Sequence, residues 1–204
     1  IELKRSTVSA HEGIRQNIRN QQDGYIPRFF TTIQLLFAGN DTEGLHYGVI
    51  KTPEKFWLRW KEPCGEPCAK PHFTAEEYPN ELDRSVLQFF ETARLLEYIH
   101  DFIIFDGGVK KTARPNQYFA IKAAQPRVRN KQNGIIWHSQ GSGKSLTMIW
   151  LAQWIRENVE DARVVIITDR DELDKQIENG FKDAGEQIKR ATSGDKLIGM
   201  LNVA

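Results

Sequence analysis

The stretch Gly134-Ile-Ile-Trp-His-Ser-Gln-Gly-Ser-Gly-Lys-Ser-Leu146 decides the fold of the second half of this 204-residue chain. Its apolar start, residues 135–137, predicts a short buried strand, and the good helix formers from Leu146 onward predict a helix. A glycine-rich turn, a lysine and a serine lie between them. A strand, a glycine-rich loop, a lysine with a hydroxyl residue and a helix form the P-loop, which cradles phosphates.

The chemistry of this loop predicts binding of ATP with Mg²⁺. Gly141, Ser142 and Gly143 form the turn in which backbone N–H groups approach the phosphates, and the helix N-terminus adds the positive end of its dipole. Lys144 is expected to reach the β- and γ-phosphates, and Ser145 to ligate Mg²⁺. The alternative is an ordinary glycine turn before a surface helix. We disfavour it because the predicted strand and helix flank the loop in the required order.

Composition is that of an ordinary soluble globular chain, with 40% hydrophobic and 27% charged residues. The net charge of +1 favours no class of partner, so any basic surface must be local. No apolar stretch reaches membrane-spanning length, and no signal peptide is recognisable, so we expect a cytoplasmic protein without membrane contact. The chain begins with Ile1 rather than methionine. We therefore expect an internal piece of a longer protein, or a sequence that lacks its beginning.

Cys64 and Cys68 are the only cysteines, and with His72 they make a loose C-x3-C-x3-H pattern. A zinc site would need a fourth ligand and another spacing. Free thiols in a reducing cytosol are the favoured interpretation.

The first four residues predict the end of a strand. Side chains alternate along a strand, so Glu2 and Lys4 should share one face while Ile1 and Leu3 turn to the core. A carboxylate and an ammonium on one face can hold a divalent metal and position a water, as metal-dependent phosphodiester cleavage requires. Taken alone, such a pair is more often a surface salt bridge. Its weight therefore depends on the rest of the chain.

A helix is expected over Val8–Gln22, with Ser9 and Glu12 as a capping box and Ile14 and Ile18 on one face. Buried strands are predicted at 29–37 and 45–50, as an antiparallel pair around a turn at 38–44, with a third at 56–61. Core packing is the favoured role for Trp57 and Trp60, over stacking on DNA.

Further along, 64–79 predicts a loop, 81–105 one long helix and 106–112 a flexible break with a turn signal. Pro115 suits the first turn of the next helix. The apolar run 162–168 predicts a parallel, doubly buried strand. Ligands of open α/β sheets lie beyond the carboxyl ends of strands, so Thr168 and Arg170 are expected to contact a phosphate backbone. The last stretch, 192–201, predicts a loop and the start of a helix.

Gln117 falls on the first or second turn of the helix that Pro115 begins. Its amide offers one donor and one acceptor, which match the paired acceptor and donor of an adenine edge. Without the downstream P-loop, a surface glutamine would be the better interpretation.

Three segments, in this order and spacing, resemble the superfamily 2 helicase motors: Arg114-Pro-Asn-Gln117 as the glutamine motif, His138–Ser145 as motif I and Thr168–Leu173 as motif Ia. The stretch 134–148 is similar to the restriction (R, motor) subunit of type I restriction–modification enzymes. Histidine at the first P-loop position is usual in that family, and His138 stands there.

The same family carries a PD-(D/E)xK nuclease upstream of its motor. Ile1-Glu-Leu-Lys4 matches the E-x-K half of that motif. Gln16 matches the glutamine of the family's Q-x-x-x-Y motif, with Asn20 in place of the tyrosine.

The resemblance implies an α/β fold in three parts. Residues 1–79 would form the C-terminal part of a restriction-endonuclease-like nuclease domain, 80–110 a linking helix and hinge, and 111–204 the N-terminal part of the first RecA-like motor domain, with a parallel sheet.

The resemblance also implies the activity of the whole enzyme. It would be an ATP-dependent type I site-specific deoxyribonuclease that translocates double-stranded DNA, works with methyltransferase and specificity subunits, and cleaves far from its recognition site. Glu2 would hold the nuclease metal, and Lys4 would orient or activate the water with Gln16 beside them. Arg114 and Gln117 would bind the nucleotide with the P-loop, and Thr168 and Arg170 would contact DNA.

Two alternatives stay open. One is a superfamily 2 translocase without nuclease activity, and the other is a nucleotide-responsive scaffold that docks a partner. The nuclease aspartate should precede Ile1, and the acidic box and second motor domain should follow Ala204. We therefore expect the 204-residue chain alone neither to translocate nor to cut.

Overall fold

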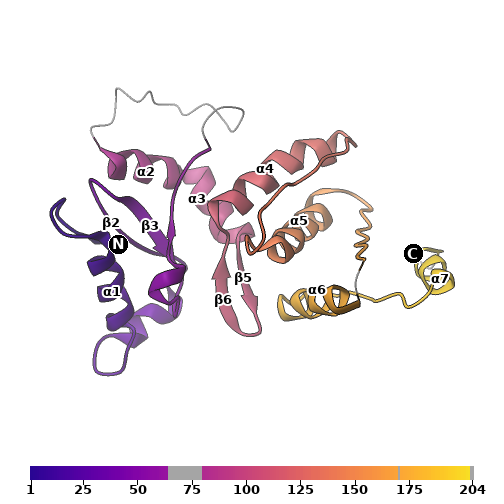
Figure 1. Cartoon of the computed structure of the whole chain (residues 1–204), viewed down its shortest axis with the longest axis horizontal. Helices are drawn as coiled ribbons and strands as arrows, with labels where there is room; N and C mark the ends of the chain where they lie inside the picture. The colour runs from indigo at the N-terminus through magenta and orange to yellow at the C-terminus, as the bar shows by residue number, and fades with distance from the viewer. Residues whose placement is uncertain (64–79, 170, 203–204) are drawn as a thin grey trace.

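The computed structural model of the chain describes residues 1–63, 80–169 and 171–202 (Figure 1). Its N-terminal part is built on a four-stranded sheet in the order β1-β2-β3-β4. β1 runs parallel to β2, and the remaining neighbours are antiparallel, as predicted for the central pair. The strands are β1 (Glu2–Leu3), β2 (Leu36–Asn40), β3 (Gly44–Gly48) and β4 (Leu58–Arg59). The predicted α/β class is thus confirmed, with a parallel pair in this sheet.

Two helices, α1 (Ala10–Asn20) and α2 (Glu81–Phe89), pack on opposite faces of the sheet. Alternate residues of β2 separate the two sides. Ala38 packs with Ile14 of α1, whereas Phe37 lies edge-on to Phe89 of α2, with ring centroids 5.2 Å apart. The prediction that Ile14 lies on the buried face of its helix is confirmed.

The prediction that Ile1 and Leu3 turn to the core is wrong. Their exposed fractions are 70% and 54%, because α2 packs on β2 and β3 and leaves this face of β1 open. The two tryptophans behave as predicted, since Trp57 and Trp60 are both buried in the core.

The predicted strand over 29–37 is only partly correct. Pro27–Thr32 form a 3-10 helix (η1), and β2 begins at Leu36 and continues through part of the predicted turn. Pro27 occupies the first position of η1, where its fixed φ suits a helical turn. A second short 3-10 helix, η2 (Glu54–Phe56), precedes β4.

The single helix expected over 81–105 is two helices, α2 and α3 (Thr92–Asp101). α2 ends at Phe89, and the Glu91 carboxylate accepts hydrogen bonds from the N–H groups of Ala93 and Arg94, which starts the new helix. A glutamate is an uncommon N-cap, so the sequence pattern favoured a continuous helix here.

The expected flexible break at 106–112 is a β-hairpin instead. β5 (Ile103–Asp106) and β6 (Val109–Thr112) pair antiparallel around Gly107 and Gly108, whose φ values are +58° and +78°. Two central residues with positive φ are what a tight hairpin turn of the primed type requires. The buried Lys110 ammonium donates to the carbonyl of Ile33 at 3.1 Å, which ties the hairpin to the N-terminal part.

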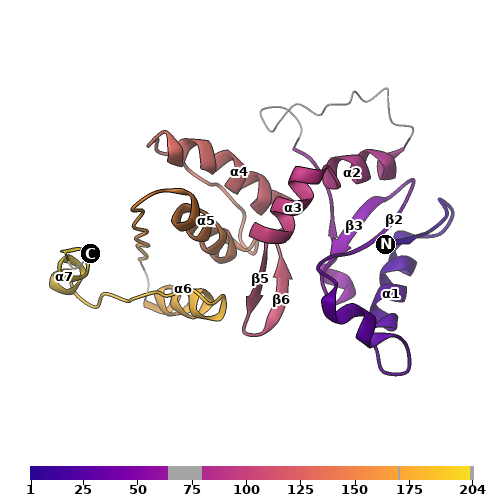
Figure 2. The ribbon, with the colours of Figure 1, turned by 180° about the vertical axis from the view of Figure 1, so that it is seen from behind.

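The C-terminal part contains four helices in the described ranges beyond β6. They are α4 (Pro115–Arg129), α5 (Lys144–Asn158), α6 (Asp171–Asp183) and α7 (Gly194–Asn202). Figure 2 shows α5 between α4 and α6, and α5 packs on both neighbours. Pro115 begins α4, as predicted, and α7 begins at Gly194 within the stretch 192–201, where a loop and the start of a helix were expected.

The strands predicted at 135–137 and 162–168 are absent, and both runs are irregular. Ile135, Trp137 and Ile167 are 88%, 89% and 87% exposed, so these apolar runs are not buried. A strand needs a ladder partner for its backbone N–H and C=O groups. No strand among the described residues lies beside either run. The parallel sheet expected for the motor half is therefore not formed by the described residues 111–169 and 171–202.

One aromatic-rich core runs from the N-terminal sheet to α5. It joins side chains of β2, β3, α2, α3, β5, α4 and α5 with residues that directly follow β4, α3 and β6: Phe37, Leu45, Tyr47, Trp60, Leu82, Phe89, Tyr98, Phe102, Ile104, Ala113, Tyr118, Phe119, Ile121 and Trp150. Within the described ranges, none of the helices combines the length and apolar character that a membrane crossing requires. The cysteines, His72 and the loop predicted at 64–79 lie outside the described residues.

Candidate nucleotide-binding and nuclease sites

The glycine-rich loop ends at the start of α5. Gly143 is the N-cap residue of this helix with φ of +82°, and Gly141 has φ of +75°. Both angles lie in the left-handed region, where a side chain costs about 1–2 kcal/mol. The glycines of the motif thus satisfy backbone requirements of this turn.

The first turn of α5 is open to an anion. The first hydrogen bond of the helix runs from the N–H of Thr147 to the carbonyl of Gly143, at 3.1 Å. The N–H groups of residues 144–146 precede it, so they have no partner within the helix and can face phosphate oxygens. Together with the Ser145 hydroxyl as an oxygen ligand, this donor set fits a triphosphate with Mg²⁺.

The Lys144 side chain folds over the loop to which it belongs. Its ammonium donates to the carbonyls of Ser139 and His138, at 3.0 and 3.3 Å. The hydroxyl of Ser142 also donates to the Ser139 carbonyl, at 2.7 Å. The cation therefore already lies against the loop and is exposed to solvent.

Arg114 and Gln117 reach this loop from the first turn of α4. The Arg114 guanidinium donates to the carbonyl of Gly141 at 3.4 Å. The Gln117 amide donates to the carbonyl of Gly143 at 2.8 Å and accepts from the Arg114 N–H at 2.7 Å. Gln117 is only 1% exposed. All the residues predicted to bind ATP are thus brought together, and Gln117 holds the loop itself.

A second cluster lies where β1 meets α1. The Lys4 ammonium donates to Glu2 Oε1 at 3.0 Å and to Gln16 Oε1 at 2.6 Å. All three side chains are half-buried. The three residues predicted for the nuclease site therefore converge, although Gln16 lies on a different element from Glu2 and Lys4.

Close contact between α1 and the sheet makes this convergence possible. A Cβ at Gly13 would lie 3.1 Å from the carbonyl oxygen of Glu2 and 3.2 Å from Cβ of Ala38. The buried Asn17 amide donates to the carbonyl of Phe37 at 3.2 Å. Helix and strand thus approach closely enough for Gln16 to reach Lys4.

The start of α1 is held by a residue that the sequence analysis missed. Glu43 accepts hydrogen bonds from the N–H of Ala10 and the hydroxyl of Ser9, at 3.1 and 3.4 Å. Burial opposes ionisation of Glu43, but these bonds and one from Asn40 lower its pKa overall. Ser9 does cap the helix, by accepting from the N–H of His11, at 3.3 Å. The expected partner in a capping box, Glu12, instead pairs with Arg15.

The donor set of the second cluster fits a metal ion only in part. Glu2 offers one carboxylate and Gln16 one amide oxygen, both of which hard cations accept. Lys4 contacts both oxygens and would have to turn aside. Glu2 can thus serve as one ligand of Mg²⁺, with the remaining ligands supplied by water or other groups.

Of the two residues predicted to contact DNA, only Thr168 lies among the described residues. Thr168 lies half-buried in the irregular segment before α6. Arg170 lies outside the described residues. Their expected role depended on the end of a parallel strand, which is not present here.

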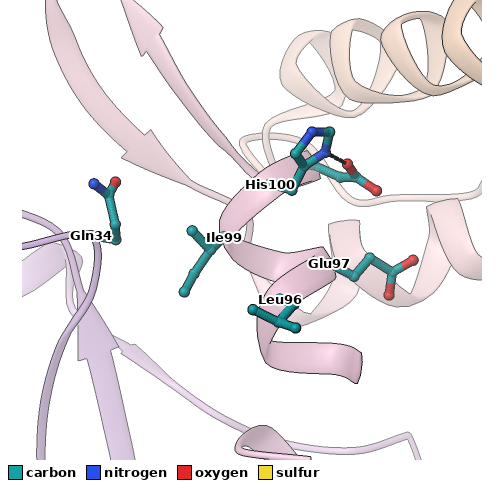
Figure 3. A pocket seen from close by; sticks show the side chains of 6 residues that line it. Gln34, Leu96, Glu97, Ile99 and His100 are labelled. Atoms are coloured by element: carbon teal, nitrogen blue, oxygen red, sulfur yellow. Dashed lines mark hydrogen bonds and ion pairs between the residues drawn. The ribbon is translucent and has the colours of Figure 1, made fainter. Parts of the chain in front are cut away.

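An open hollow of about 790 Å³ lies beside α3 and Gln34, and Figure 3 shows Leu96, Ile99 and His100 along it. None of the predicted site residues lines it. Its wide opening to solvent argues against a ligand pocket, because such pockets enclose most of their ligand.

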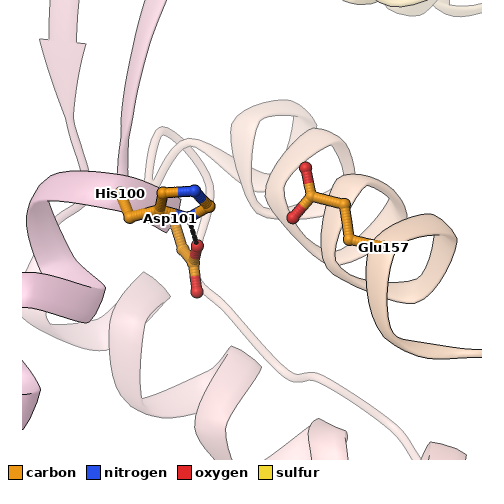
Figure 4. A group of neighbouring side chains, drawn as sticks. All are labelled: His100, Asp101 and Glu157. Atoms are coloured by element: carbon orange, nitrogen blue, oxygen red, sulfur yellow. Dashed lines mark hydrogen bonds and ion pairs between the residues drawn. The ribbon is translucent and has the colours of Figure 1, made fainter.

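His100, Asp101 and Glu157 form the group of possible metal ligands found among the described residues, with ligand atoms within 4.8 Å of one another. Figure 4 shows the imidazole directed at Asp101, with Glu157 on the neighbouring helix. The carboxylate of Asp101 raises the pKa of His100 by hydrogen bonding. Because His100 and Glu157 are exposed, we interpret the group as a solvated charge cluster.

Two family models match this chain. Residues 1–55 match the type I restriction enzyme R protein N terminus, and residues 116–204 match the SWI2/SNF2 ATPase. The first range contains the Glu2 cluster, and the second contains Gln117 and the glycine-rich loop.

The names of curated relatives agree with the first of these matches. The type I restriction enzyme SauCOLORF180P endonuclease subunit of Staphylococcus aureus is 24% identical over 211 residues, which cover 99% of this chain and 21% of the relative. The type I restriction enzyme HindI endonuclease subunit of Haemophilus influenzae is 28% identical over 127 residues, or 55% of this chain and 12% of the relative. A Methanocaldococcus jannaschii protein, named as a candidate subunit of the same kind, is 33% identical over 124 residues, which cover 55% of this chain and 12% of the relative. The chain thus spans about a fifth or less of these relatives.

Proposed function

Because the chain belongs to the family of type I restriction enzyme R subunits, we propose that it carries parts of two machines. One is a nuclease centre at Glu2, Lys4 and Gln16, and the other is an ATP site at the glycine-rich loop. The single observation that carries this proposal is the presence of both clusters in one chain, each drawn together from separate elements.

At the ATP site, the proposed division of labour follows the contacts. The N–H groups at the start of α5 and the Lys144 ammonium neutralise phosphate charge, and Ser145 ligates Mg²⁺. Arg114 and Gln117 fix the loop through the carbonyls of Gly141 and Gly143. Gln117 keeps one amide hydrogen and one oxygen lone pair for an adenine edge, since only one of each is used in the bonds described.

At the nuclease centre, Glu2 holds Mg²⁺, which supplies charge stabilisation and an activated water when bound. Lys4 exchanges its contact with Glu2 for one with the water or the scissile phosphate, and Gln16 orients the Lys4 ammonium through the 2.6 Å hydrogen bond. Lys4 thus acts as the positioning cation for the attacking water.

The proposal for the whole enzyme is ATP-dependent translocation of double-stranded DNA coupled to Mg²⁺-dependent cleavage away from the recognition site. Methyltransferase and specificity subunits are the proposed partners, with Thr168 and Arg170 proposed to contact DNA in the complete motor. The proposed compartment is the cytoplasm.

Two substitutions in the full-length subunit, assembled with its partners, test this assignment. Lys144→Ala should abolish DNA-stimulated ATP hydrolysis, and cleavage with it. Glu2→Gln should abolish cleavage but leave ATP hydrolysis intact. Glu12→Gln is the control for Glu2→Gln, because Glu12 is an exposed carboxylate of α1 that forms an ion pair with Arg15 and takes no part in the Glu2 cluster.

The second candidate is a superfamily 2 translocase without nuclease activity. The match of residues 116–204 to the SWI2/SNF2 ATPase and the lone carboxylate of the Glu2 cluster favour it. Normal DNA cleavage by the Glu2→Gln enzyme would select this candidate, and unchanged ATP hydrolysis by the Lys144→Ala enzyme would exclude both.

A further inference from the structure

Two buried tyrosine hydroxyls meet at one backbone carbonyl. Tyr47 of β3 and Tyr98 of α3 are both 0% exposed. The Tyr47 hydroxyl donates to the carbonyl of Ala113 at 2.9 Å, the Tyr98 hydroxyl contacts the same carbonyl, and the two hydroxyls are 3.2 Å apart. A carbonyl oxygen has two lone pairs, so it can accept from both. Burial raises the pKa of both tyrosines, which keeps them as protonated donors.

The carbonyl that they hold immediately precedes the nucleotide-binding elements. Ala113 is fully buried, and its N–H donates to the carbonyl of Phe102 at 3.0 Å. The next residue, Arg114, caps α4 and donates its N–H to the Gln117 amide at 2.7 Å. Both the N–H and the C=O of Ala113 are therefore hydrogen-bonded, directly before Arg114.

The same series of hydrogen bonds continues into the glycine-rich loop. Gln117 donates to the carbonyl of Gly143 at 2.8 Å, and this carbonyl also accepts the first helical N–H of α5. The space is tight, because a Cβ at Gly143 would lie only 2.5 Å from the Gln117 amide nitrogen. A displacement of the first turn of α4 would thus move the Gln117 amide against Gly143 and shift the start of α5.

We propose that Tyr47 and Tyr98 are positioning residues for the ATP site, which they act on through Ala113 and Gln117. The inference rests on the proposed function in taking the loop at 141–145 to bind ATP. The two tyrosines lie on elements outside the motor-like match, and β3 belongs to the same sheet as Glu2. ATP affinity is therefore set partly by the nuclease-side sheet and the connecting helix.

Tyr118 provides a matched control within the chain. It is a tyrosine of α4 with 3% exposure, and its hydroxyl donates to Glu97 at 3.2 Å rather than to Ala113. Tyr118→Phe removes a buried hydroxyl from the same core but leaves the Ala113 carbonyl with both of its donors. It therefore separates a general loss of packing from loss of the proposed contact.

The test uses the full-length subunit assembled with its partners, in the forms wild type, Tyr47→Phe, Tyr98→Phe, the double variant and Tyr118→Phe. A fluorescent ATP analogue measures Kd, and steady-state hydrolysis measures KM and kcat. The double variant should raise Kd and KM about tenfold, equivalent to about 1.4 kcal/mol, with kcat within a factor of two. Each single variant retains one donor and should show a smaller rise, whereas Tyr118→Phe should match wild type.

A second arm repeats the double variant in a Gln117→Ala background. If the tyrosines act through Gln117, their removal there should change Kd by less than a factor of two. An unchanged Kd of the double variant, an equal loss in Tyr118→Phe, or the full tenfold loss in the Gln117→Ala background would each overturn the inference. Failure of the wild type to bind the analogue, or normal binding by Lys144→Ala, would instead overturn the proposed ATP site. Thermal unfolding identifies a folding defect, and the folded single variants then decide the outcome.

Discussion

Alanine at Gly143 should damage the ATP site by two separable effects. The first is the backbone: at φ of +82° an alanine costs about 1–2 kcal/mol relative to glycine. The second is steric, since the new Cβ would lie 2.5 Å from the Gln117 amide nitrogen. Gln117 is buried, so displacing its amide breaks a hydrogen bond without offering water, at a cost of about 1–3 kcal/mol. The sum is about 2–5 kcal/mol of folding free energy.

Gly141 separates these effects. Its φ of +75° imposes the same backbone cost, but a Cβ there would meet nothing within 4 Å. Gly141→Ala should thus lower the free energy of unfolding by only about 1–2 kcal/mol. Urea unfolding of the chain, followed by circular dichroism, gives both free energies of unfolding. Binding of a fluorescent ATP analogue to the assembled enzyme should weaken more for Gly143→Ala than for Gly141→Ala.

A double-mutant cycle with Gln117→Ala completes the experiment. Alanine at 117 vacates the space that the Cβ needs, so the additional loss of Gly143→Ala over Gly141→Ala should disappear in that background. Equal losses for the two glycine variants, or an additional loss that persists without the Gln117 side chain, would refute the reasoning.

Three other substitutions test the contacts that stabilise the N-terminal sheet and its helices. Glu43→Gln should lower the free energy of unfolding by about 1 kcal/mol at pH 7, because the Glu43 carboxylate accepts from the N–H of Ala10 at the start of α1. Because the pKa of Glu43 is lowered in the folded protein, its stabilisation is present above the ordinary glutamate pKa and is lost as pH falls through the folded value. The urea unfolding curves of wild type and Glu43→Gln should therefore converge in acid. Convergence at high pH instead would contradict this sign. Gly39→Ala should cost about 3 kcal/mol, since its Cβ would lie 2.5 Å from the Gly44 carbonyl oxygen, whereas Gly199→Ala in α7 meets open space and should not destabilise. Trp60→Ala should cost about 3–5 kcal/mol in the same assay, and a loss below 1 kcal/mol would show that the aromatic core is not continuous there.

The residues of both clusters could be predicted because their signals are local or carried by a motif. Glycines at two left-handed positions, a lysine and a serine before a helix identify the loop without any knowledge of the tertiary structure. The E-x-K pair was predicted by strand alternation, and the structure places Glu2 and Lys4 on one face. The functions of these residues stay predictions, as do the domain limits at 79 and 110.

Elements that depend on distant partners could not be predicted in the same way. The runs 135–137 and 162–168 have the composition of buried strands, but a strand forms only where another strand supplies its hydrogen bonds. The Glu43 cap joins a turn to a helix that begins 33 residues earlier, and the Tyr47–Tyr98 pair spans 51 residues. Neither leaves a pattern at short spacing. At Gly107-Gly108 the turn signal was recognised, because two adjacent glycines favour a tight turn, but the pairing of the flanking strands was not predicted.

The aromatic core connects the α2 side of the N-terminal sheet with α4 and α5, whereas the Glu2 cluster lies on the α1 side of the same sheet. Trp60 of the N-terminal sheet lies 5.7 Å from Tyr118 and 5.4 Å from Phe119 of α4, measured between ring centroids. Tyr98 lies 5.5 Å from Tyr118, and Phe102 reaches Trp150 of α5 at 6.4 Å. Interiors packed in this way transmit displacement rather than absorb it. We therefore expect a shift of α4 and α5 on nucleotide binding either to move these rings against the sheet or to be resisted by them.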